Sequence, residues 1–236
     1  MPEELTSSPL GNYSFVASPG RPFSAGIVAD DGYDLVHATF RHPRPLKEGL
    51  AVVRRHVEEA GRPVQAIAGF ELRIPEPWDR AGFNAFNEGY IAELTKMGLH
   101  VDGLMPAART NVAPLLDPPS EPVVLAFTYT VTGQPRGRAF LVAGATESAG
   151  DQDEAALRSS LGSVESTLGR LGIGWSDATG VQFYGESVPA GFGEIVLAHI
   201  GAPAGRSVRW FPSRPPITDF AIEIDTSSCS QELVLS

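Results

Sequence analysis

Apolar positions along the chain follow two periods, one near two residues and one near 3.6, which predicts alternating strands and helices. Leu46, Leu50, Val53 and Val57 recur at helical spacing. In the first half the pattern predicts strands at residues 13–17, 23–29, 34–40, 64–74, 108–113 and 123–131, and helices at 46–60 and 83–94. We expect residues 1–10, which are polar and rich in Pro and Ser, to be a loose tail. We expect residues 42–45, with two prolines, to interrupt regular structure.

The same order of strand-like and helix-like patterns returns after residue 137. Residues 132–137 are rich in turn formers and have no apolar period, so they mark a boundary. Beyond it, strands are predicted at residues 138–145, 178–184 and 219–226, the last as the closing strand, and helices at 154–171 and 191–200. A chain of 236 residues suits two compact units of about 120 residues each. The sequence therefore predicts two domains, 1–132 and 138–236, built to one plan.

Composition and charge narrow the possible partners. The net charge of -10, from 18 basic and 28 acidic residues, argues against nucleic-acid binding. No run of about 18 apolar residues predicts a membrane span. An acidic N-terminus and the single Cys229 favour a cytoplasmic protein. The five histidines have no ligand-like spacing and no phosphate-binding loop is present, so we expect neither a metal nor a cofactor.

Four motifs of the first half stand in the order of a known family. Phe86-Asn87-Glu88-Gly89-Tyr90 lies on a predicted helix and precedes Pro106-Ala107-Ala108-Arg109-Thr110, while Gly11-Asn12-Tyr13-Ser14 and Ser24-Ala25-Gly26 lie on early strands. Together they resemble the RidA/YjgF/UK114 family. The resemblance implies an α+β fold of two tandem chorismate-mutase-like (RidA-type) domains, each a β-sheet with two helices packed on one face. Pro203-Ala204-Gly205-Arg206-Ser207 echoes the arginine motif in the second domain.

Two residue types carry the chemistry that this resemblance implies. The family's arginine binds the substrate carboxylate, which corresponds to Arg109 and, in the second copy, to Arg206. The closing strand Phe220-Ala221-Ile222-Glu223-Ile224-Asp225 is similar to the family's I-E-I-E strand, which makes Glu223 the residue that activates water, with Arg206 as its partner. The copies differ in complementary ways, because Val124 stands in place of the glutamate in copy one, while Gly193 and Val196 replace Asn87 and Tyr90 in copy two.

The residue types alone also allow non-catalytic roles for these positions. Arg109 has the type and position of an ordinary surface arginine, since isolated surface charges are common and contribute little. Alternation places Glu223 and Asp225 on one strand face, which is solvent-exposed if the strand is an edge. Trp210 suits a pocket for an aromatic or doubly anionic ligand, but equally core or trimer packing.

The predicted function is an imine or enamine deaminase, a hydrolase of a small carboxylate that needs no cofactor. Its catalytic residues are Glu223 and Arg206, and its substrate-binding residues are Arg109, Tyr13, Asn87, Gly144 and Trp210. Ile27 follows Gly26 and Ala145 follows Gly144 where the family has glutamine or serine, which argues against its standard 2-aminoacrylate substrate.

Two alternatives remain for the function, and the assembly is a separate expectation. A chorismatase-like hydrolase of a cyclic carboxylate suits the arginines from Arg206 to Arg214, and a non-catalytic ligand-binding trimer suits the incomplete site of each copy. Single-copy family members are trimers with ligand sites between subunits. Two helices per sheet also leave apolar surface to bury, so a homotrimer or a multiple of three is expected.

Overall fold

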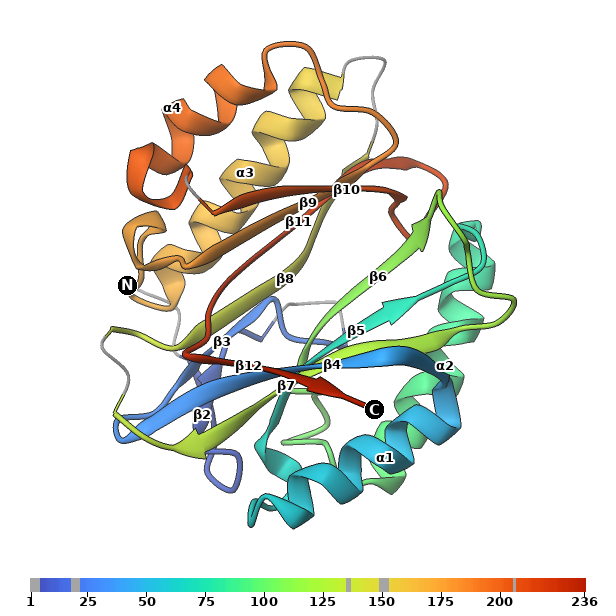
Figure 1. Ribbon diagram of the computed structural model, residues 1–236, viewed down its shortest axis with the longest axis vertical. Helices are drawn as coiled ribbons and strands as arrows, with labels where there is room; N and C mark the ends of the chain where they lie inside the picture. Colours follow the sequence, from blue (N-terminus) through green and yellow to red (C-terminus); the bar gives the residue numbers. More distant parts are fainter. Residues whose placement is uncertain (1–4, 18–21, 135–136, 149–152, 206) are drawn as a thin grey trace.

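The computed structural model describes residues 5–17, 22–134, 137–148, 153–205 and 207–236. In Figure 1, helices α3 and α4 lie at the top and α1 and α2 at the bottom and right, with the strands between them. The described helices are α1 (Leu46–Glu59), α2 (Arg80–Lys96), α3 (Asp153–Arg170) and α4 (Phe192–Gly205), with short 3-10 turns η1 (Val64–Ala66) and η2 (Trp175–Asp177). The strands are β1 (Thr6–Ser8), β2 (Tyr13–Phe15), β3 (Gly26–Ala29), β4 (Tyr33–Pro45), β5 (Ile67–Arg73), β6 (Ala108–Pro114), β7 (Val123–Thr132), β8 (Phe140–Ser148), β9 (Gly180–Gly185), β10 (Val208–Arg214), β11 (Phe220–Ser228) and β12 (Gln231–Leu235).

The first half places α1 and α2 on one face of its strands. Strands β4, β7, β5 and β6 are neighbours in that order, with β5 and β6 parallel. The apolar stripe of α1, with Leu50, Val53 and Val57, packs with Tyr90 and Leu94 of α2 against these strands. This confirms the helical spacing expected from the sequence.

The second half repeats this arrangement with α3 and α4. Its strands run in the order β8, β11, β9, β10, and β9 and β10 are parallel. Leu157, Leu161, Val164 and Leu168 of α3 are buried against them, as their spacing predicted. The element order β4-α1-β5-α2-β6-β7 is matched by β8-α3-β9-α4-β10-β11.

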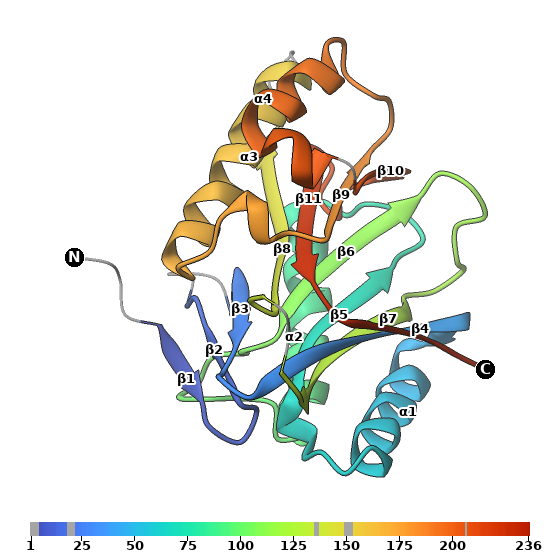
Figure 2. The ribbon, with the colours of Figure 1, turned by 60° about the vertical axis from the view of Figure 1, so that its left-hand side comes forward.

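Strands of one half pair with strands of the other half at three places. The hairpin β2–β3, from the start of the chain, pairs with β8 of the second half through Gly26 and Val142. Strand β10 pairs with β6 through Ser213 and Pro114, and β12 at the C-terminus pairs in parallel with β4. Figure 2 shows β12 returning along β4. The halves are therefore joined into one continuous strand order.

Three local predictions were wrong. Residues 6–8 are not a loose tail, because β1 pairs with β2. Residues 42–45 do not interrupt β4, because Arg44 and Pro45 still pair with β7, after a register shift that accommodates the prolines. The strand predicted at 219–226 does not close the fold, because β12 follows it. Pairing with another strand, which single-strand patterns do not record, decided each case.

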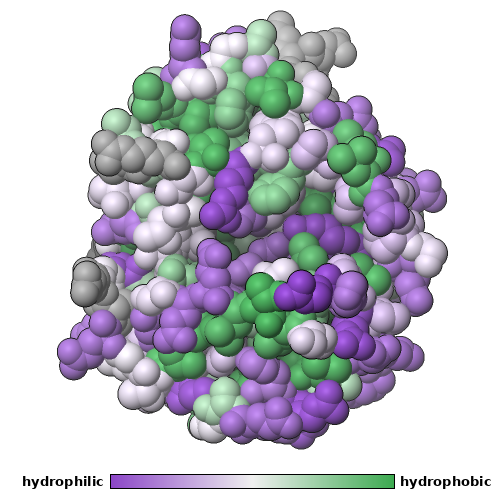
Figure 3. Space-filling view, viewed as in Figure 1, coloured by the Kyte–Doolittle hydropathy of each residue, from purple (hydrophilic) through white to green (hydrophobic). Residues whose placement is uncertain are grey.

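On the face drawn in Figure 3, hydrophobic residues form patches among hydrophilic ones. Within the described part of the chain, no helix is both long and apolar enough to cross a membrane.

Candidate active site

Helix α2 and strand β6 place Arg109 in an aromatic cage. The arginine is the second residue of β6, and its guanidinium donates a 2.5 Å hydrogen bond to Oδ1 of Asn87 on α2. It lies 4.1 Å from the ring centroid of Phe23, 5.4 Å from that of Phe83 and 5.5 Å from that of Tyr90. Aromatic faces attract a cation and leave its edge free to donate. Arg109 is therefore held in place rather than mobile at a surface.

Strand β11 places Glu223 on the face opposite the helices. Its neighbours Ile222 and Ile224 are buried in the core with α3 and α4, so alternation turns the glutamate away from that core. Glu223 is nevertheless only 1% exposed. The solvent-exposed interpretation of this strand face is therefore wrong.

Arg109 and Glu223 line one cavity of about 370 Å³ between the two halves. Its walls come from the segment before β3, from α2, β6, β8, α3 and β11, and from the loop before β11. The lining residues are Pro22, Phe23, Ser24, Ala25, Arg80, Phe83, Asn84, Asn87, Arg109, Asn111, Val142, Ala143, Gly144, Ser163, Thr167, Pro216, Ile217, Phe220 and Glu223. A cavity of this size suits a small ligand.

Buried polar atoms of this cavity lack partners among the described residues. They are Oγ of Ser24, both side-chain amide atoms of Asn111, and Oε2 of Glu223. Folded proteins pair most such groups, and those left unpaired in a cavity mark a place where a ligand or water supplies the partner. The cavity therefore offers a carboxylic acid, an amide and a guanidinium to one bound molecule.

The environment shifts the ionisation of both principal groups. Burial, together with the negative charge of Asp225, raises the pKa of Glu223 well above its usual range, although Arg109 and the backbone N–H of Asn111 act in the opposite direction. Glu223 therefore holds a proton at a higher pH than an ordinary glutamate. Burial lowers the pKa of Arg109 to about 10, so the guanidinium keeps its charge at neutral pH.

Asp225, two residues after Glu223, links β11 to strands β6 and β8 by hydrogen bonds. It accepts hydrogen bonds from the Thr110 hydroxyl of β6 and from the backbone N–H of Gly144 at 2.9 Å. Gly144 has φ +73, and an added Cβ would lie 2.8 Å from the carbonyl oxygen of Arg109, so only glycine fits. Burial raises the pKa of Asp225 to about 7, against the Thr110 hydrogen bond, which lowers it.

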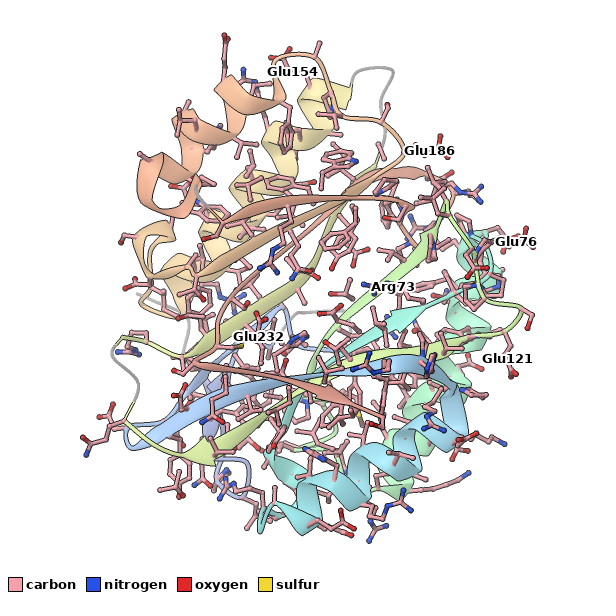
Figure 4. All side chains as sticks on the ribbon, in the orientation of Figure 1. Arg73, Glu76, Glu121, Glu154, Glu186 and Glu232 are labelled. Carbon is pink, nitrogen blue, oxygen red and sulfur yellow. The ribbon has the colours of Figure 1, made fainter. Side chains whose placement is uncertain are left out.

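A second cavity, of about 250 Å³, has Asp225 in its lining and is lined by both acidic and basic residues. In it Glu71 is 3.0 Å from Nε2 of His37 and 3.1 Å from Nη2 of Arg73. Burial acts to raise the pKa of Glu71, but these two partners lower it to about 2. Figure 4 shows Arg73 and Glu232 between the upper and lower layers. Among the described residues, no group of three or more His, Cys, Asp or Glu is arranged to hold a metal ion.

The structure brings some of the predicted residues together and separates others. Arg109, Asn87, Gly144 and Glu223 line the larger cavity. Tyr13 is fully buried and donates to the carbonyl of Ile67 at 2.9 Å, away from the cavity lining.

Of the two predicted residues on and before β10, Trp210 is described and does not line the larger cavity. Trp210 packs against Phe183 and Phe192 in the core of the second half, which favours its packing interpretation. Arg206 lies outside the described residues.

Sequence reasoning missed several residues of the cavity. Asn111 had a usable signal, because a strand residue two positions after Arg109 shares its face. Phe83 lies at the start of the helix predicted at residues 83–94, and its ring faces Arg109. Arg80 and Ser163 had no local signal, because they reach the cavity through the packing of α2 and α3.

Comparisons with known proteins agree with a deaminase. The family model described as "2-aminomuconate deaminase CnbZ" matches residues 5–233. A curated relative from Comamonas testosteroni, 2-amino-5-chloromuconate deaminase, is 34% identical over 257 aligned positions, with both chains fully covered.

Two solved structures are similar to this chain to different degrees. A chorismatase crystal structure has a TM-score of 0.55 and 13% identity, over 95% of this chain and 79% of that one. A Mycobacterium tuberculosis member of the YjgF/YER057c/UK114 family has a TM-score of 0.33 and 23% identity, over 40% of this chain and 81% of that one. The family match over nearly the whole chain settles the family: this chain belongs to the CnbZ 2-aminomuconate deaminase family.

Proposed function

We propose that this protein is a deaminase that hydrolyses an enamine or imine of a small unsaturated amino dicarboxylate, of the 2-aminomuconate type, and releases ammonia. The observation that carries the proposal is the shared cavity of Arg109 and Glu223, in which Oε2 of Glu223 has no partner among the described residues. The names of the family and of the curated relative support the substrate class.

Arg109 is the clamp for the carboxylate beside the reacting carbon. Its fixed, planar fork of donors matches a carboxylate, and Asn87 occupies one donor so that the others stay oriented. Holding the substrate in one pose replaces a chance encounter with a positioned reaction. Asn111, whose side-chain amide is buried and unpaired in the described part of the chain, is placed to accept from and donate to the same ligand.

Glu223 begins the reaction as an acid, because its pKa is raised. It gives its proton to the carbon next to the amino-bearing carbon of the enamine, which produces an iminium. The resulting carboxylate takes a proton from water as the water oxygen bonds to the iminium carbon, giving a carbinolamine. Glu223 then protonates the nitrogen, the C–N bond breaks and ammonia leaves. The hydroxyl proton returns to Glu223, leaving a ketone.

We also propose that the two halves are copies of one unit that have divided the site between them. The support is the matched order of elements and of strands in each half. The first half supplies Arg109 and Asn87, and the second supplies Glu223 and Gly144. This replaces the expectation that Glu223 works with Arg206. The likeness to a chorismatase concerns the fold alone.

The test is ammonia release from freshly prepared 2-aminomuconate by the wild type and by Glu223→Gln. Glutamine keeps the shape but carries no transferable acid proton, so turnover should fall by about 100-fold or more. Glu88→Gln, on the exposed side of α2, is the matched control and should behave as the wild type. Ammonia release by Glu223→Gln at the wild-type rate would remove Glu223 from the mechanism. Absence of release by the wild type would refute the deaminase proposal.

A further inference from the structure

We infer that Arg80 binds the second carboxylate of the substrate, at the mouth of the cavity, and thereby selects dicarboxylates over monocarboxylates. This inference rests on the proposed deaminase function for the identity of the ligand. It adds a binding residue that lies far from Glu223 in the sequence and that no motif pointed to.

Arg80 is held at the cavity by its backbone. It is the first residue of α2, and the preceding Asp79 caps the helix by accepting from the N–H of Gly82 at 2.7 Å. Trp78 forms a bridge to the loop before β11, with hydrogen bonds of 2.9 Å to Pro216 and 3.0 Å from Thr218. The start of α2 is thus tied to the second half of the chain.

The guanidinium of Arg80 has no ionic partner within the described part of the chain. It lies 6.0 Å from the ring centroid of Phe220, and it is exposed at the cavity. A cation at the N-terminus of a helix opposes the helix dipole; the first turn of α2 has no acidic residue, and the carboxylate of the N-cap residue Asp79 accepts from the N–H of Gly82. Both facts suit a site that becomes neutral when an anion binds.

The length of α2 sets the distance between Arg80 and Asn87, the residue that orients Arg109. Arg80, Phe83, Asn84 and Asn87 follow each other at three and four residues and all line the cavity, so they form one stripe of α2. Seven residues of helix span about 10 Å, which places Arg80 that far along the axis from Asn87 and the Arg109 that it orients. An extended dicarboxylate of six carbons, which include the two carboxylate carbons, bridges such a gap when the guanidinium groups of Arg80 and Arg109 both point into the cavity.

The charge of the cavity fits two anionic groups. Among the described residues that line it, Arg109 and Arg80 are the two cations, and the one carboxyl group, Glu223, holds its proton more firmly than usual. The unpaired amide of Asn111 and the unpaired Oε2 of Glu223 lie on the inner wall, where the amino-bearing end of the substrate reacts. The reactive end therefore lies at Arg109 and the distal carboxylate at Arg80.

The experiment measures binding with two stable probes that differ by one carboxylate. These are trans,trans-muconate and trans,trans-2,4-hexadienoate, which have the same conjugated six-carbon chain. By calorimetry the wild type should bind muconate more tightly. In Arg80→Gln the muconate Kd should rise about tenfold while the hexadienoate Kd stays unchanged. Arg80→Lys, which keeps the charge but not the fork, should lie between them.

Arg55→Gln, an exposed arginine of α1 outside the cavity lining, is the matched control and should bind both probes as the wild type does. Equal affinity of the wild type for the two probes, no binding of muconate, or unchanged muconate affinity in Arg80→Gln would each overturn the inference. With 2-aminomuconate, the variant should show a raised KM and a nearly unchanged kcat. Failure of the wild type to release ammonia would instead count against the proposed function, since the probe affinities do not depend on turnover.

Discussion

Replacing Arg109 by lysine isolates the geometry of the proposed carboxylate clamp. Lysine keeps the positive charge that the rings of Phe23, Phe83 and Tyr90 surround, so the electrostatics of the cavity change little. It cannot reproduce the planar fork, which in the wild type bonds Asn87 with one edge and leaves parallel donors for a carboxylate. The change therefore removes orientation and keeps attraction.

The expected loss follows from the hydrogen bonds that lysine cannot make. A hydrogen bond to a charged group contributes about 1.5 to 3 kcal/mol, and one of the two parallel bonds to the substrate carboxylate should be lost. Since about 1.4 kcal/mol corresponds to a factor of ten, kcat/KM should fall by about 10- to 100-fold. The free energy of unfolding should change little, because the cation and its aromatic neighbours remain.

The assay is steady-state ammonia release with 2-aminomuconate, with thermal unfolding of each variant measured in parallel. Arg209→Lys is the matched control, because Arg209 is the second residue of β10 as Arg109 is of β6, but it lines the smaller cavity. It should leave kcat/KM near the wild-type value. If Arg109→Lys were as active as the wild type, or if Arg209→Lys were the more damaging change, the clamp would not be Arg109 and the proposed cavity would be the wrong one.

Two further predictions concern stability and assembly. Burial raises the pKa of Asp225 from 3.8 to about 7, so its contribution to the free energy of unfolding is fully present below pH ~4 and is lost as the pH rises to about 7. At about 1.4 kcal/mol per pKa unit this is at most about 4 kcal/mol; urea unfolding of Asp225→Asn should show a smaller fall in this window, since the raised pKa of Glu223 still contributes part of it, and an unchanged fall would contradict the assignment. Glu71 acts in the opposite direction and in a separate window, between pH 4.5 and about 2. We also expect a homo-oligomer, because Leu115, Leu116 and Phe211 expose 39%, 77% and 38% of their surface in neighbouring loops and strands. A multiple of three is what the resemblance to the trimeric RidA/YjgF/UK114 family implies. Light scattering that finds a stable monomer at micromolar concentration would refute the expectation.

The sequence by itself determined the elements whose signal is local. The spacing of Phe86, Tyr90 and Leu94 predicted α2, and the structure has that helix with Tyr90 and Leu94 buried. Alternation along β11 correctly put Ile222 and Glu223 on opposite faces. These predictions succeed because helix and strand periods depend only on neighbours in the chain.

Only the tertiary structure decided which residues meet. Thr110 and Asp225 are hydrogen-bonded although they are 115 residues apart in the sequence, and the same juxtaposition of β6 and β11 puts Arg109 in the cavity of Glu223. Motif order alone paired Glu223 with Arg206, which lies outside the described residues. Strand pairing between the halves, through β3 with β8 and β10 with β6, accompanies a cavity that Arg109 of the first half and Glu223 of the second half both line. Such pairing depends on backbone hydrogen bonds and on burial against distant strands, which no local pattern records.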